Sequence, residues 1–75
     1  MNERWRTTIS SPPDREEVVA EIFFGNSQFA ELNREANDIR VEIYPSASSQ
    51  AWSMSLEELR AAINEAEDKL SAMSD

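Results

Sequence analysis

Three glutamates, Glu21, Glu31 and Glu42, are the side chains of this sequence that could supply acid–base chemistry. In the strand pairing that we predict below, Glu21 lies opposite Glu31, and Glu42 lies nearby. Glycoside hydrolysis uses such a pair of carboxyl groups. The reaction also needs a cleft that raises the pKa of one carboxyl group and binds the sugar. A flat sheet in so short a chain offers no such cleft, so we expect the protein not to be an enzyme.

The same carboxylates could hold a hard cation, but the sequence shows no calcium-loop spacing and contains little aspartate. Cysteine and histidine are both absent from the chain. Their absence excludes thiolate nucleophiles, disulfides, zinc sites of the Cys/His type and the Ser-His-Asp arrangement. We therefore expect no catalytic residue, no metal site and no cofactor.

The charge balance of the chain indicates the class of partner. Its 75 residues include 7 Lys or Arg and 15 Asp or Glu, which gives a net charge of −8. We expect no nucleic-acid partner, because phosphate binding needs a basic stripe and the basic residues here are scattered. An acidic surface instead favours basic proteins. No signal segment and no membrane-spanning run is visible, so a cytoplasmic protein without membrane contact is expected.

Hydrophobic periodicity predicts one domain over residues 1–75 with four strands and one helix. The strands are expected at about residues 4–9, 18–24, 28–34 and 38–44, and a further short edge strand at residues 51–54. The helix is expected at about residues 55–73, because Ser55 and Glu58 match the capping box. Its apolar stripe consists of Leu56, Leu59, Ile63, Ala66, Leu70 and Met73. We predict an α+β fold: a four-stranded antiparallel meander sheet with the C-terminal amphipathic helix packed on one face.

Turn chemistry predicts how the strands pair. Gly25, Asn26 and Ser27 form a three-residue loop, since Gly and Asn tolerate positive φ. The resulting pairs between the second and third strands are Phe23 with Phe29, Ile22 with Ala30, and Ala20 with Leu32. The next turn pairs Leu32 with Ile39 and sets Glu31 opposite Arg40, a favourable cross-strand charge pair.

This register assigns the side chains to two faces of the sheet. Under the helix we expect Val18, Ala20, Ile22, Ala30, Leu32, Ile39, Val41 and Ile43. On the open face we expect Val19, Glu21, Phe23, Phe29, Glu31, Arg40, Glu42 and Tyr44. Aromatic residues among charges are typical of binding surfaces, so seven of these, all except Val19, are the predicted partner-binding residues. Alternatively, Phe23 and Phe29 form a cross-strand pair covered by Trp5, Trp52 or the proline-rich loop.

The segments SPPDREEVVAEIFF, QFAELN and VEIYP, followed by a Trp-containing linker and an amphipathic helix, resemble small bacterial immunity proteins of polymorphic-toxin and contact-dependent growth inhibition systems. The resemblance covers about residues 9–70. It implies a cytoplasmic inhibitor that binds a cognate toxin domain, often a basic nuclease. The alternative is a structural or regulatory subunit that self-associates, for example as a homodimer, through its open sheet.

Overall fold

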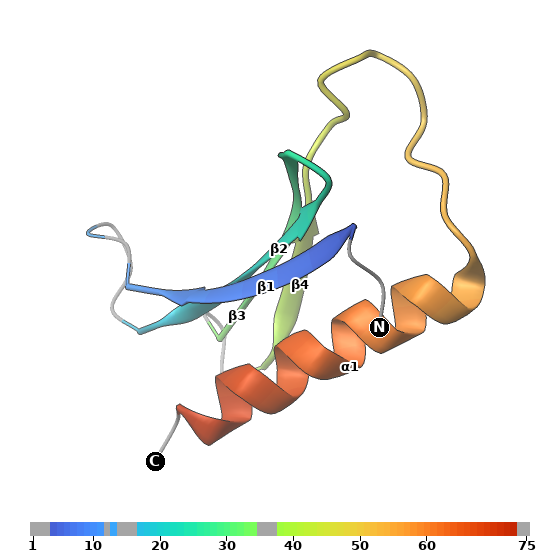
Figure 1. Cartoon of the computed structure of the whole chain (residues 1–75). Coiled ribbons are helices and arrows are strands. Elements are labelled where there is room, and N and C mark those ends of the chain that lie inside the picture. Colours follow the sequence, from blue (N-terminus) through green and yellow to red (C-terminus); the bar gives the residue numbers. More distant parts are fainter. Residues whose placement is uncertain (1–3, 12, 14–16, 35–37, 74–75) are drawn as a thin grey trace.

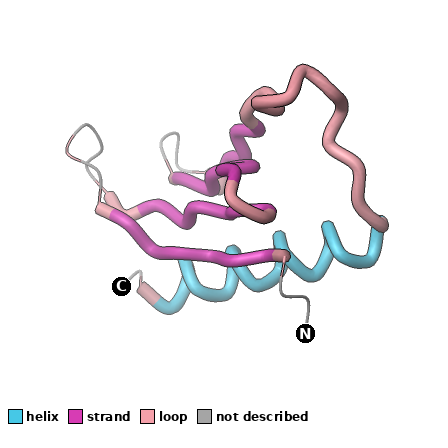
Figure 2. Tube along the Cα trace, turned by 45° about the horizontal axis from the view of Figure 1, so that its top comes forward, coloured by secondary structure: helices cyan, strands magenta, loops and turns pink. Residues whose placement is uncertain are grey.

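The computed structural model describes residues 4–11, 13, 17–34 and 38–73, and it confirms the predicted fold class. Four antiparallel strands follow one another in the order β1-β2-β3-β4, and one helix lies against the sheet (Figure 1). The elements are β1 (Trp5–Ser10), β2 (Val19–Phe24), β3 (Ser27–Asn33), β4 (Arg40–Ile43) and α1 (Leu56–Ala72). The predicted fifth strand is wrong, because residues 51–54 belong to the long connection between β4 and α1 (Figure 2).

Helix α1 begins where the capping pattern predicts. Ser55 is the N-cap residue, and its hydroxyl accepts a hydrogen bond from the Glu58 amide at 3.0 Å. The Glu58 carboxylate is turned away from the helix end, toward the Arg4 guanidinium at 2.9 Å. The cap is therefore formed by the serine hydroxyl, while Glu58 ties the helix to the start of β1.

The β2–β3 hairpin differs from the predicted three-residue loop. Phe24 pairs with Ser27 across a two-residue turn in which Gly25 has a φ of 65°. The register then shifts at a bulge, so that Phe23 pairs with Gln28 while Ile22 still pairs with Ala30. The predicted Phe23–Phe29 pair is wrong. A bulge adds one residue to its strand and re-aims a side chain. Here that residue is Phe29, which is buried in the core.

A cluster of four aromatic rings closes one end of the core. The ring of Phe29 lies 5.5 Å from that of Trp5 and 5.1 Å from that of Trp52, both edge to face. Phe24 completes the cluster, with its ring 4.6 Å from Trp5. Trp52 also donates a hydrogen bond from Nε1 to the carbonyl of Tyr44 at 2.8 Å, which fastens the long connection to the sheet. Both tryptophans are partly buried and pack against the core.

The β3–β4 ladder is shifted by two residues from the prediction. Leu32 pairs with Val41 rather than with Ile39, and Glu31 lies opposite Glu42 rather than Arg40. A shift of two keeps every side chain on its predicted face, because side chains alternate with a period of two. The predicted Glu31–Arg40 charge pair is therefore replaced by two carboxylates that face each other.

Helix α1 covers only part of the sheet. It contacts β1, β2 and β3, and none of its contacts reaches β4 among the described residues. Ile22, Leu32 and Leu70 are fully buried between the helix and the sheet, and each such side chain contributes about 1.5–3 kcal/mol. The predicted burial of the apolar side chains on β4 and just before it is wrong. Ile39, Val41 and Ile43 are 37%, 45% and 60% exposed.

The buried stripe along α1 is also shorter than predicted. Its buried residues are Ala62, Ala66 and Leu70, while Leu56 at its start and the C-cap residue Met73 are exposed. The small alanines let the helix lie close to β1 and β2. No helix within the described residues is long and apolar enough to cross a membrane.

Candidate functional site

The face of the sheet that α1 does not cover has a buried carboxylate at its centre. Glu31 on β3 is only 5% exposed. Its Oε2 accepts a hydrogen bond from Asn33 Nδ2 at 3.0 Å, and its Oε1 accepts one from the Tyr44 hydroxyl at 3.2 Å. A buried carboxylate is tolerated only where its oxygens are hydrogen-bonded in this way. Glu31 thus fixes the positions of Asn33 and Tyr44 on this face.

Asn33 links Glu31 to the neighbouring strand. Its Nδ2 also donates to Glu42 Oε2 at 2.8 Å, so one amide group bridges two carboxylates. Asn33 itself is fully buried. The arrangement holds the exposed Glu42 in a fixed direction on β4.

Beside this network, Phe23 on β2 is packed under a basic side chain from β1. The Arg6 guanidinium lies 4.5 Å from the centre of the Phe23 ring, in cation–π geometry. Glu21 is half-buried and lies opposite Thr8 in the β1–β2 ladder. The outer face therefore offers one stacked aromatic ring between charged side chains.

The structure brings together five of the seven predicted partner-binding residues on the accessible face: Glu21, Phe23, Arg40, Glu42 and Tyr44. The other two are corrected. Phe29 lies in the core and Glu31 is only 5% exposed, so the predicted place of both side chains on the accessible surface is wrong. For the remaining five, partner binding stays a prediction.

Sequence reasoning missed a feature on the other face, a row of exposed apolar side chains on β4 and on the residue just before it. This apolar row consists of Ile39, Val41 and Ile43, and it continues the face that α1 packs on. Strand β4 is hydrogen-bonded to β3 on one side and forms an open edge of the described sheet on the other. The row could have been predicted from the width of a single helix, which is too small to cover a four-stranded sheet. A helix about 10 Å across covers roughly two strands spaced about 4.8 Å apart, not four.

Strand β4 is accordingly the element at which three kinds of recognition chemistry meet. One face presents the apolar row, the other presents Arg40 and Glu42, and the outer edge pairs with no other strand of the described sheet. No group of three carboxylates within the described residues is arranged to hold a metal ion. No protein-family model, curated protein or solved structure matches this chain.

Proposed function

We propose that this protein is a non-catalytic binding protein that neutralises a basic toxin domain, as an immunity protein does, and that it docks through β4. The observation that supports this most is the exposure of β4: all four of its residues are exposed and its outer edge is unpaired in the described sheet. A partner protein could contact β4 on both of its faces and along its outer edge. Binding there would bury side chains and pair backbone groups that are exposed in the protein alone.

The apolar row supports a protein partner rather than a small molecule. Three β-branched side chains stand side by side at 37%, 45% and 60% exposure, next to the helix-covered core. Contiguous exposed apolar surface beside polar residues marks interaction sites. An open strand edge adds main-chain hydrogen bonds to the same interface, as in strand addition. A specific complex then needs roughly 800 Å² per partner.

The charge of the chain supports a basic partner. The net charge is −8, and the outer face carries Glu42 on β4 itself and Glu21 two strands away on β2. Such a field speeds the encounter with a basic protein and disfavours an acidic one. A basic toxin domain fits this requirement, and a blocked active site needs no chemistry from the inhibitor.

The open β4 edge also supports the second candidate, a subunit that self-associates. Two β4 strands paired antiparallel around a two-fold axis would cover both apolar rows. Each copy has a net charge of −8, however, and that charge opposes the approach of a second copy. We therefore place the heterologous complex first.

The test is affinity capture with the intact protein as bait, at low and at moderate salt, followed by purification of whatever is retained. We expect one basic protein that binds one-to-one, is weakened by salt and loses its own activity when bound. The protein alone should stay a monomer at all concentrations in light scattering. A stable dimer and no retained partner would instead establish self-association.

A further inference from the structure

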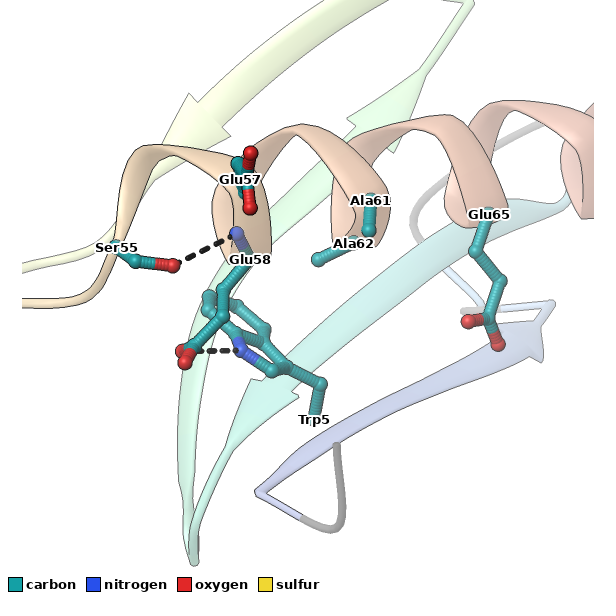
Figure 3. A pocket seen from close by; sticks show the side chains of 7 residues that line it. All are labelled: Trp5, Ser55, Glu57, Glu58, Ala61, Ala62 and Glu65. Carbon is teal, nitrogen blue, oxygen red and sulfur yellow. Dashed lines mark hydrogen bonds between the residues drawn. The ribbon is translucent and has the colours of Figure 1, made fainter. Parts of the chain in front are cut away.

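A hollow with a volume of about 510 Å³ lies between α1 and β1, at the edge of the sheet opposite β4. Trp5, Ala61 and Ala62 give it apolar walls. Its acidic lining consists of Glu57, Glu58 and Glu65, all on α1. Figure 3 shows Trp5 beneath the first turns of the helix and Glu65 reaching from the helix toward the strand. We refer to this hollow as the α1–β1 groove.

Strand β1 presents an open row of backbone groups along this groove. Gly25 donates its amide proton to the Arg4 carbonyl at 2.6 Å, so the main chain of Arg4 faces β2. Lys69 Nζ donates to the Thr7 carbonyl at 3.3 Å, so the main chain of Thr7 faces away from β2. Backbone groups alternate along a strand edge. Trp5, Thr7 and Ile9 therefore direct their N–H and C=O groups to the outside of the described sheet.

Two basic side chains of the chain itself already lie at the groove. The Arg4 guanidinium donates to both carboxylate oxygens of Glu58, at 3.0 and 2.9 Å. Lys69 Nζ lies between the Thr7 carbonyl and Glu65 Oε2, which is 3.2 Å away. These contacts show which chemistry the groove accommodates: a cation placed between the helix carboxylates and the strand edge. The Lys69–Glu65 pair is exposed to solvent, so it is weak and can be exchanged. Glu58 is half-buried and also accepts a hydrogen bond from Trp5 Nε1 at 3.3 Å, so an incoming cation would replace Arg4 while Trp5 keeps the carboxylate in place.

We propose that the α1–β1 groove binds an extended basic segment of another protein, which adds as a fifth strand beside β1 and directs Arg or Lys side chains to the helix glutamates. Glu58 and Glu65 are seven residues apart, about 10.5 Å along the helix. Successive helix-facing side chains of an extended segment are about 6.6 Å apart. Two long basic side chains can therefore reach both carboxylates while their stems cover Trp5.

Charge complementarity decides the class of occupant. The α1 flank that lines the groove contributes three carboxylates, and the whole chain has a net charge of −8, so a second copy or an acidic segment is disfavoured. Lys69 competes with the incoming segment for both the Thr7 carbonyl and Glu65. From its place on α1, Lys69 therefore hinders the pairing of another strand with β1, as lysine side chains on edge strands do. This site lies at the other edge of the sheet from β4 and does not depend on the function proposed above.

The test uses a fluorescent octapeptide of alternating arginine and threonine, titrated with the full chain and followed by anisotropy. Three further peptides replace arginine by glutamate, or carry N-methyl groups on one or the other set of alternate residues. We expect saturable binding of the parent peptide and none of the glutamate peptide. One of the two methylated peptides should bind at least about tenfold more weakly than the parent peptide, because its N–H groups that face β1 are replaced and can no longer donate hydrogen bonds to the strand.

Variants of the chain test the same point from the other side. Glu65→Lys should weaken binding at least about threefold, whereas Lys69→Ala should strengthen it. Thr7→Pro removes only an outward N–H and should weaken binding while the β1–β2 ladder is kept. Glu67→Lys is the matched control, because Glu67 is exposed on α1 and does not line the groove.

Three results would overturn the proposal: no saturable binding of the parent peptide, equal binding of both methylated peptides, or an equal effect of Glu65→Lys and Glu67→Lys. The last two would show attraction to acidic surface without a strand site. If Thr7→Pro fails to fold, the methylated peptides decide the question alone. None of these outcomes bears on docking at β4, which is tested with β4 variants.

Discussion

Val41 lies directly opposite Leu32 in the β3–β4 ladder, with both side chains on the same face of the sheet, yet Leu32 is 1% exposed and Val41 is 45% exposed. The difference comes from α1, which contacts β3 and stops short of β4. The boundary between core and open surface therefore runs between these two residues. The Leu32 side chain stabilises the fold from within the core, whereas the Val41 side chain belongs to the surface that we propose for binding.

This boundary predicts unequal costs for the same kind of truncation. Leu32→Ala should lower the free energy of unfolding by about 2–5 kcal/mol, because it leaves a cavity in the core. Val41→Ala should cost less than about 1 kcal/mol, since nearly half of this residue's surface is already in contact with water. Urea denaturation followed by tryptophan fluorescence measures both values. Equal costs for the two variants would mean that β4 is covered in solution.

The bulge in β3 predicts a second contrast. Phe29→Ala should cost about 3–5 kcal/mol, or prevent folding altogether, because the ring fills the core between Trp5 and Trp52. Phe23→Ala should cost clearly less, since its half-buried ring packs under Arg6 on the open face. Thermal unfolding of the two variants gives the ranking. The reverse ranking would support the three-residue loop and the Phe23–Phe29 pair.

Several features of the fold could be predicted from the sequence because they depend on local patterns. The serine cap starts α1, and the alternation in β2 and β3 places Ala20, Ile22, Ala30 and Leu32 toward the helix. The exact pairing could not be predicted in the same way. A two-residue turn plus a bulge gives the same pairs as a three-residue loop from Ile22 back to Ala20. The pattern of apolar residues therefore does not distinguish the two arrangements.

The candidate site was harder to predict because it depends on distances between elements. A two-residue shift of β4 leaves every face unchanged, yet it replaces the Glu31–Arg40 pair by the Glu31–Glu42 pair. Periodicity also cannot say which strands one helix covers. Only the packing of α1 on β1 and β2 shows that Val41 and its neighbours remain open.

The buried network around Glu31 predicts a strong response at Asn33. Asn33→Ala removes the amide that donates to Glu31 and Glu42, and should cost about 1–3 kcal/mol. Asn33→Asp should cost more at neutral pH, because it adds a third carboxylate between the other two. Its carboxylate neighbours and its burial would raise the pKa of the new group, so the extra cost should shrink as the pH falls and should vanish below the ordinary aspartate pKa of about 3.9. Chemical denaturation at two pH values tests this. A pH-independent difference between the two variants would contradict it.

The N-cap of α1 offers a local test of helix stability. Ser55→Ala removes the acceptor of the Glu58 amide proton and should cost about 0.5–2 kcal/mol. Ser53→Ala, two residues earlier in the exposed connection, is the matched control and should change little. The midpoint of thermal unfolding monitored by circular dichroism reports both. A cost for Ser53→Ala as large as that for Ser55→Ala would show that the cap is not the cause.

Charge placement on β4 tests the binding surface with a matched control on α1. Ile43→Asp and Leu56→Asp alter apolar side chains of equal exposure, 60% and 61%. Only Ile43→Asp should lower the affinity for the captured basic partner, by at least about tenfold, because it places a charge in the apolar row. Leu56→Asp should leave affinity unchanged, and aspartate is favourable in the first turn of a helix. Calorimetric titration of each variant with the purified partner gives the two affinities.

The most direct test of the central claim is amide hydrogen exchange of the protein, free and saturated with the captured partner. We predict that slowed exchange on binding is concentrated in residues 40–43 of β4 and in the strand face beside it. Protection that appears elsewhere while β4 exchanges as in the free protein would contradict docking at this strand.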